Sequence, residues 1–157
     1  MTTLTSTYCG VHQLVADVTL LNENRVLMIR TNNGSPPEDH DGWYLPDDYV
    51  GDLEHPDDAA HRILEEQADT SPEYVKLSHI DSYVADDGAW NLAFHYIAHV
   101  SIVGDIDSDD TQETRWFDLG ALPESSEVAN SGQPLSVVAR AVNSATDKPD
   151  IHRPSTQ

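Results

Sequence analysis

Alternating apolar and polar residues predict the strands of this chain. The alternation at residues 14–20 is typical of a half-buried strand, because successive strand side chains point to opposite faces. Asn22-Glu23-Asn24 is typical of a hairpin turn, and the apolar run 26–29 predicts a strand covered on both faces. Two longer strands are predicted near 76–85 and 91–103. One face of the second strand carries Leu92, Phe94, Tyr96, Ala98, Val100 and Ile102.

Helical periodicity appears in two further stretches. Pro56 is suited to a first turn, and Asp57 and Asp58 complement the positive end of a helix there. Its inward stripe is predicted to hold Ala59, Ala60, Ile63, Leu64 and Gln67. Ser71-Pro72 is expected to end this helix. A second helix is marked by Leu135, Val137, Val138, Ala141 and Val142, and a short strand is predicted at 115–117.

These elements predict one α+β domain with helices flanking a mixed sheet. The domain is expected to span residues 11–145, after a flexible N-terminal segment, 1–10, and before a polar tail, 146–157. Residues 31–41, with two prolines and no apolar pattern, and the acidic stretch 104–112 are predicted to be exposed loops.

The charge balance is strongly acidic along the whole chain. Aspartate and glutamate number 28 against 8 lysines and arginines, which gives a formal charge of -20. The acids are spread too evenly for an acidic tail, and the apolar patterning argues against a disordered chain. Such a composition resembles that of proteins from halophilic archaea, where salt screens charges beyond about 3 Å at 1 M. Acidic clusters are therefore weaker evidence for metal sites in this chain.

The same charge disfavours nucleic acid as a partner, because phosphate backbones are neutralised by lysine and arginine. Cys9 is the single cysteine, so no disulfide or cysteine metal site is expected, and its thiol has no sequence neighbour to activate it. No apolar run is long enough to span a membrane, and no charged segment followed by an apolar run opens the sequence, so no signal peptide is expected. A cytoplasmic protein without membrane contact is expected.

The stretch from Gly42 to Asp69 carries the candidate chemistry. An aromatic-proline turn, Gly42-Trp43 with Leu45-Pro46, leads through an acidic loop into the first helix. With Glu54, Arg62 and Glu66, this stretch resembles the Nudix hydrolase signature G-x(5)-E-x(7)-R-E-U-x-E-E-x-G-U, where U is a bulky aliphatic residue. The resemblance covers roughly residues 11–145. It implies a Nudix-type α/β/α sandwich with a mixed central sheet.

The register of the signature is set by the seven residues between Glu54 and Arg62. Four defining positions are kept, Glu54, Arg62, Leu64 and Glu66. Five differ from the family pattern, Asp48, Ile63, Gln67, Asp69 and Thr70. At about 100° per residue, positions 63, 66 and 67 share one helical face, whereas Glu65 lies about 160° from position 63. The family places three magnesium-binding carboxylates on that face, and only Glu66 remains here.

The resemblance implies Glu66 as the main ligand of magnesium or manganese, with Glu54 and Arg62 as catalytic supports. Asp47 or Asp48 could supply a further carboxylate, although both fit an acidic surface equally well. Asp109, Asp110 and Glu113 precede the closing strand, where some family members place another ligand; a solvated acidic turn is the alternative. The metal-site candidates are therefore Glu66, Asp48 and Glu113.

Candidate ligand contacts lie outside the helix. The resemblance makes Arg30 a phosphate contact, and Trp43, Tyr44 and Trp90 could stack a nucleobase unless they are buried core residues. His95 and His99 share a strand face but lie about 13 Å apart, too far for one metal ion, and are predicted to be polar-face residues.

Two functions remain open. The first is magnesium-dependent cleavage of a nucleoside diphosphate linked to another group, weakened or lost through Ile63, Gln67 and Asp48. The second is a non-catalytic module that binds or senses a small nucleotide-like ligand. The sequence leaves the oligomeric state open.

Overall fold

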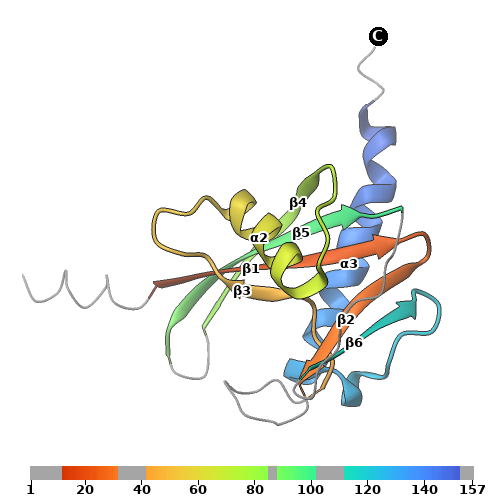
Figure 1. The fold of residues 1–157 in the computed structure, drawn as a ribbon, viewed down its shortest axis with the longest axis horizontal. Coiled ribbons are helices and arrows are strands. Elements are labelled where there is room, and N and C mark those ends of the chain that lie inside the picture. The colour runs from red at the N-terminus through yellow and green to blue at the C-terminus, as the bar shows by residue number, and fades with distance from the viewer. Residues whose placement is uncertain (1–11, 32–41, 85–87, 102–111, 153–157) are drawn as a thin grey trace, which may run out of the picture.

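Six strands form one mixed sheet between two helices, as the computed structural model shows for residues 12–31, 42–84, 88–101 and 112–152 (Figure 1). The strands are β1 (His12–Asn22), β2 (Arg25–Thr31), β3 (Asp47–Tyr49), β4 (Val75–Val84), β5 (Trp90–His99) and β6 (Gln112–Asp118). The helices are α2 (Pro56–Ala68), the short 3-10 helix η1 (Ser125–Glu127) and α3 (Ala129–His152). In Figure 1, α2 lies in front of the sheet and α3 behind it. The predicted α/β/α sandwich with a mixed sheet is confirmed.

Strand β1 is the centre of the sheet, whose order is β4-β5-β1-β2-β6. It runs parallel to β5 along its length and antiparallel to β2 at Leu21 and Asn22 only. Beyond that turn, the segment 43–50 inserts between β1 and β2. Its backbone bonds Ile29 on one side, and on the other Val18 donates to the Pro46 carbonyl at 3.1 Å. This insertion places β3 beside β1 and directly ahead of the loop to α2.

Two apolar layers hold the helices to the sheet. On one face, Ala16, Val18 and Leu20 of β1 pack with Ile63 and Leu64 of α2. The opposite face packs against α3, through Leu21, Met28, Ile97, Val138 and Ala141. The period-2 prediction for β1 is therefore confirmed. It follows that Asp17 and Thr19, which alternate with the first set, lie on the α3 face.

Gly42 permits the tight approach of the inserted segment to the start of α3. Its φ is +109°, and a Cβ there would lie 2.6 Å from the carbonyl oxygen of Glu127. The next residue, Trp43, donates its backbone N–H to that same carbonyl at 3.0 Å, and its own carbonyl accepts from Ala129 at 2.9 Å. A side chain at position 42 would therefore displace the backbone contact between these segments.

Several predicted boundaries were wrong. Helix α2 ends at Ala68, because Asp69 adopts a left-handed conformation and its N–H bonds the Leu64 carbonyl; Ser71-Pro72 lies beyond it. Ala68 takes the buried place predicted for Gln67. Strand β5 ends at His99, and β3 was missed because three residues give no periodic signal.

The structure describes only part of the predicted chain ends and loops. Helix α3 continues through residues 146–152, which were assigned to a polar tail. The predicted N-terminal segment with Cys9, the loop 31–41 beyond Thr31, and residues 104–111 with Asp109 and Asp110 lie outside the described residues. In the described part of the chain, no helix is long and apolar enough to cross a membrane.

Candidate functional site

Arg62 is the centre of a polar network that joins α2 to the loop before it. Its guanidinium donates to both carboxylate oxygens of Glu54, at 2.9 and 3.1 Å, and to Asp48 Oδ2 at 2.9 Å. It also donates to the backbone carbonyl of Tyr49 at 3.0 Å and, at a longer 3.4 Å, to Glu66. The hydrogen bonds to Glu54, followed by the one to Asp48, raise the pKa of Arg62 above its ordinary value. The network fixes β3 and the loop against the helix.

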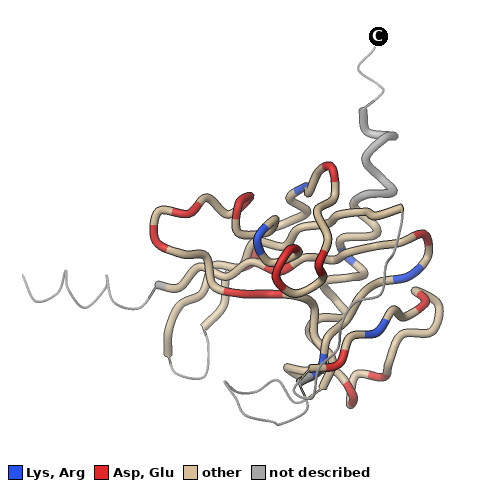
Figure 2. Tube along the Cα trace, in the orientation of Figure 1, with Lys and Arg blue, Asp and Glu red and all other residues tan. Residues whose placement is uncertain are grey.

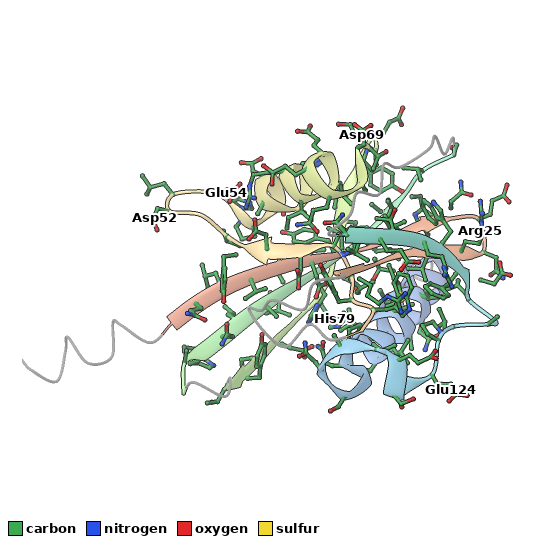
Figure 3. The ribbon with its side chains drawn as sticks, turned by 60° about the horizontal axis from the view of Figure 1, so that its bottom comes forward. Arg25, Asp52, Glu54, Asp69, His79 and Glu124 are labelled. Carbon is green, nitrogen blue, oxygen red and sulfur yellow. The ribbon has the colours of Figure 1, made fainter. Side chains whose placement is uncertain are left out.

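Glu54 is the loop side of this network. One oxygen accepts the backbone N–H of Gly51 at 2.8 Å, while the carboxylate as a whole pairs with Arg62. The hydrogen bonds from Arg62 and Gly51 lower the pKa of Glu54 below its ordinary 4.5. Figure 3 shows Glu54 beside the start of α2, and Figure 2 shows acidic residues in succession along β3, the following loop and α2.

Ile63 and Gln67 have structural roles in this molecule. Ile63 is fully buried in the apolar layer beneath α2. Gln67 pairs with the backbone of Asp47, donating from Nε2 to its carbonyl at 2.8 Å and accepting its N–H at 3.2 Å. Glu66, by contrast, has a side chain that is 58% exposed. Positions 63, 66 and 67, predicted to share a face, are thus separated into a core residue, a surface residue and a backbone clamp.

Each candidate metal carboxylate already has an arginine partner. Asp48 and Glu66 both contact Arg62, so the structure brings these two together. Glu113 lies on a different element, β6, where it accepts from Arg30 at 2.7 Å and from Arg115 at 3.2 Å. The hydrogen bond from Arg30 is the main reason that the pKa of Glu113 is lowered. A metal ion at any of these carboxylates would compete with a guanidinium.

Arg30 and Trp43 belong to a second group, on the face of the sheet that α3 covers. The guanidinium carbon of Arg30 lies 4.5 Å from the centre of the Trp43 ring, and that of Arg115 lies 5.2 Å from it. Phe117 meets Trp43 edge-on, with ring centres 5.1 Å apart. Trp43 is only 3% exposed, so a base could stack on it only by displacing one of these neighbours.

The other aromatic candidates lie apart from this group. Tyr44 is 9% exposed and pairs with Ile29 through its backbone; burial and the nearby Asp47 raise its pKa to about 12. Trp90 is 42% exposed at the start of β5.

The sequence analysis missed a cluster of His79, Asp81 and His95 on the α3 face. His95 is buried, with 1% exposure, so the prediction that it is a polar-face residue like the exposed His99 was wrong. Its ring contacts Asp17 on one side and Asp81 on the other. His79 and Asp81 alternate with Ser78 and Ile80, and that spacing was the available signal. These three residues could together hold a metal ion.

Two aspartates beside this cluster have strongly perturbed acidity. Burial raises the pKa of Asp17, against the lowering effect of its hydrogen bond to His95. Burial, followed by the charges of Asp17 and Asp48, raises the pKa of Asp47 to about 8. The carboxyl of Asp47 is thus a weaker acid than an ordinary aspartate, and Asp47 contacts Gln67 through its backbone.

Comparisons with known proteins agree with the fold. The profile of the NUDIX domain family matches residues 11–136. The structure is similar to a MutT NUDIX hydrolase from Burkholderia pseudomallei, with a TM-score of 0.66, 22% identity, and coverage of 82% of this chain and 97% of that one. The search of curated proteins finds no match.

Two further solved structures are similar at the same level. The NUDIX domain of Shewanella oneidensis NrtR, solved in complex with ADP ribose, has a TM-score of 0.65 and 18% identity over 84% of this chain and 87% of that one. A MutT/nudix family protein from Enterococcus faecalis has a TM-score of 0.69 and 24% identity, over 90% of this chain and 65% of that one. At these identities the similarity concerns the fold.

Proposed function

Because this chain belongs to the Nudix family, we propose that it binds a nucleoside diphosphate linked to another group and cleaves it weakly or not at all. Magnesium or manganese would be the cofactor of any cleavage. The ligand class follows from the family and from the ADP ribose bound to the NUDIX domain of Shewanella oneidensis NrtR.

The observation that carries the proposal is the use of Ile63 and Gln67 as structural residues. Ile63 fills the apolar layer and Gln67 is engaged with the backbone of Asp47, so neither offers a carboxylate to a metal ion. Glu66 is the remaining carboxylate of the three that the family uses. Magnesium can be held by one or two carboxylates together with substrate phosphates, so the donors present fit the ion poorly rather than not at all.

The charge around Arg30 supports binding of a phosphorylated ligand. Arg30 and Arg115 share one carboxylate, that of Glu113, so two positive charges meet a single negative one. The Arg30 side chain is 40% exposed and that of Arg115 is 54% exposed, which leaves both guanidiniums accessible. In a chain of net charge -20, this local excess of positive charge among the described residues suits the attraction of a diphosphate.

A second candidate, retained hydrolysis, is favoured by the placement of Asp48 next to Glu66. Both carboxylates contact the same guanidinium, that of Arg62, at 2.9 and 3.4 Å. These two side chains would supply the oxygen ligands, and the metal would supply charge for the phosphates and a more acidic bound water. Arg62 and Glu54 would hold the loop in place around them.

Calorimetry and product release with ADP-ribose, in molar KCl with magnesium or manganese, test the proposal. We expect binding with little or no turnover. Arg30→Ala should weaken binding at least tenfold, and Arg25→Ala, on the same strand, is the matched control. If turnover occurs, Glu66→Gln is compared with Glu65→Gln, which alters a neighbouring exposed carboxylate. Rapid turnover lost only in Glu66→Gln would establish the retained enzyme, and failure to bind any of a panel of nucleoside diphosphate compounds would contradict both candidates.

A further inference from the structure

We propose that His79, Asp81 and His95 form a binding site for a divalent transition-metal ion such as Zn²⁺. The site is separate from the carboxylates around Arg62, and the proposal does not depend on the function proposed above. Two imidazoles and one carboxylate are a donor set that such ions prefer, whereas magnesium and calcium prefer oxygen donors.

Strand pairing brings the three residues together. His79 on β4 lies directly opposite His95 on β5 in the antiparallel register, and their ring centres are 4.5 Å apart. Asp81 is two residues further along β4, so its side chain lies on the same face as His79. Arg140 of α3 contacts Asp81, which identifies that face as the one covered by α3. Figure 3 accordingly shows His79 and Glu54 on opposite sides of the sheet.

The distances between the ligand atoms fit a small tetrahedral ion. Asp81 Oδ2 lies 3.1 Å from His95 Nε2 and 3.7 Å from His79 Nε2. One donor atom from each of the three residues lies within 4.8 Å of the other two. Ligands bound at 2.0–2.1 Å in tetrahedral geometry are separated by about 3.4 Å, so small side-chain adjustments suffice to close the site.

Each proposed ligand is held in place through its other polar atom. His95 Nδ1 contacts both carboxylate oxygens of Asp17 at 2.9 Å. His79 Nδ1 contacts the Ser78 hydroxyl at 2.9 Å, and the second oxygen of Asp81 faces Arg140 at 3.4 Å. A carboxylate on the far nitrogen of a ligating histidine is the usual arrangement in zinc sites, because it fixes the ring orientation and the tautomer. The Nε2 atoms are thereby directed toward Asp81.

Burial and charge also suit a metal ion. The side chains of His79 and His95 are 7% and 2% exposed, whereas that of Asp81 is 41% exposed. The site is thus enclosed by its imidazoles and open on the carboxylate side, where an ion could enter and a water molecule could complete the coordination. Asp81 offers a carboxylate to the ion, and Asp17 places a second carboxylate against the far side of the His95 ring. In the part of the chain that the structure describes, this is the one group of three such residues with this geometry.

Titration of chelator-treated protein with Zn²⁺ and Co²⁺ in high salt tests the proposal. We expect one tight Zn²⁺ per chain, retained in excess Mg²⁺, and the intense visible absorption of four-coordinate Co²⁺. His79→Gln should lower the Zn²⁺ affinity at least 100-fold. Asp17→Asn, which alters a positioning residue, should lower it by about 10–100-fold. His99→Gln replaces an exposed histidine on β5, the strand of His95, and should leave the Zn²⁺ affinity unchanged.

Asp81→Asn keeps the test decisive if a histidine variant does not fold, because Asp81 is partly exposed and asparagine has the same size. It should remove the tight site and leave the metal-free unfolding midpoint close to that of the wild type. The absence of stoichiometric Zn²⁺ binding would overturn the proposal. So would equal affinity in the wild type and Asp81→Asn, since the ion would then be held by other surface carboxylates.

Discussion

Replacing Ile63 by glutamate would restore the residue type that the family carries at this position, yet we expect it to unfold the protein rather than activate it. Ile63 is completely buried among Leu64, Leu27 and Tyr96 in the layer beneath α2. The described residues of this layer are apolar, so a carboxylate introduced there would find no cation among them. It would also leave the space of the isoleucine imperfectly filled.

The magnitude follows from the desolvation of the introduced carboxyl group. Full burial raises the pKa of a carboxyl by up to about 3–5 units, and each unit corresponds to roughly 1.4 kcal/mol at a pH above both values. At pH 7 the buried group takes up a proton rather than ionising, so the charge costs about 3–4 kcal/mol; the full cost of about 4–7 kcal/mol is reached only above the raised pKa. Both values are large beside the roughly 5–15 kcal/mol that stabilises a typical domain. By comparison, Ile63→Val should cost only about 0.5–1.5 kcal/mol, since it removes one methyl group.

Urea unfolding in molar KCl, followed by tryptophan fluorescence, measures this effect. Ile63→Gln is the matched control, because glutamine has nearly the same shape as glutamate and cannot ionise. Burial raises the folded-state pKa of the introduced glutamate, so the Ile63→Glu variant is most stable at low pH, where the carboxyl is protonated. This stability is fully present below the unfolded pKa of about 4.5 and is lost as pH rises through the folded pKa. The glutamate and glutamine variants should thus be equally stable near pH 4 and diverge toward pH 7.

Equal stability of the two variants at pH 7 would refute the burial argument. Ile63→Glu combined with Gln67→Glu is the corresponding activity test. Gain of magnesium-dependent turnover by a folded double variant would show that position 63 can reach the metal site after all.

Three further predictions concern the contacts around α2 and the inserted segment. Gln67→Ala leaves the Asp47 N–H and carbonyl without their partner and should lower the free energy of unfolding by about 1–3 kcal/mol in urea titrations, whereas Glu65→Ala should change it little. Glu54→Gln removes a carboxylate whose pKa is lowered in the folded state. The ionised carboxylate stabilises the fold above its ordinary pKa of 4.5, and this stabilisation is lost as pH falls through the lowered pKa. The difference in unfolding free energy between the wild type and Glu54→Gln should therefore shrink from pH 7 to about pH 3.5; a constant difference would exclude the ion pair as its source. Gly42→Ala places a Cβ 2.6 Å from the Glu127 carbonyl at a positive φ, and should lower the thermal midpoint by several degrees more than Gly120→Ala, where nothing lies within 4 Å.

Local patterns in this chain were sufficient to predict most of the elements and to align Glu54 and Arg62 with the Nudix signature. The start of α2 at Pro56 was predicted correctly, because capping and first-turn preferences are local. Its end was not, because Asp69 closes the helix in a left-handed conformation that asparagine and glycine adopt more often. The short strand β3 forms through pairing with β1 rather than through its own periodicity.

The sequence by itself predicted the fold class, through the order of its apolar patterns, and the seven-residue spacing that aligns Glu54 and Arg62 with the Nudix signature. Both follow from patterns along the chain. The tertiary structure decided the roles of two residues of α2: Ile63 is a core side chain, and Gln67 bonds the backbone of Asp47. It also decided that His79 meets His95, because an antiparallel strand pair brings together residues that are separated by a turn in the chain. Burial and strand register are properties of packing between elements, and the pattern within one element does not contain them.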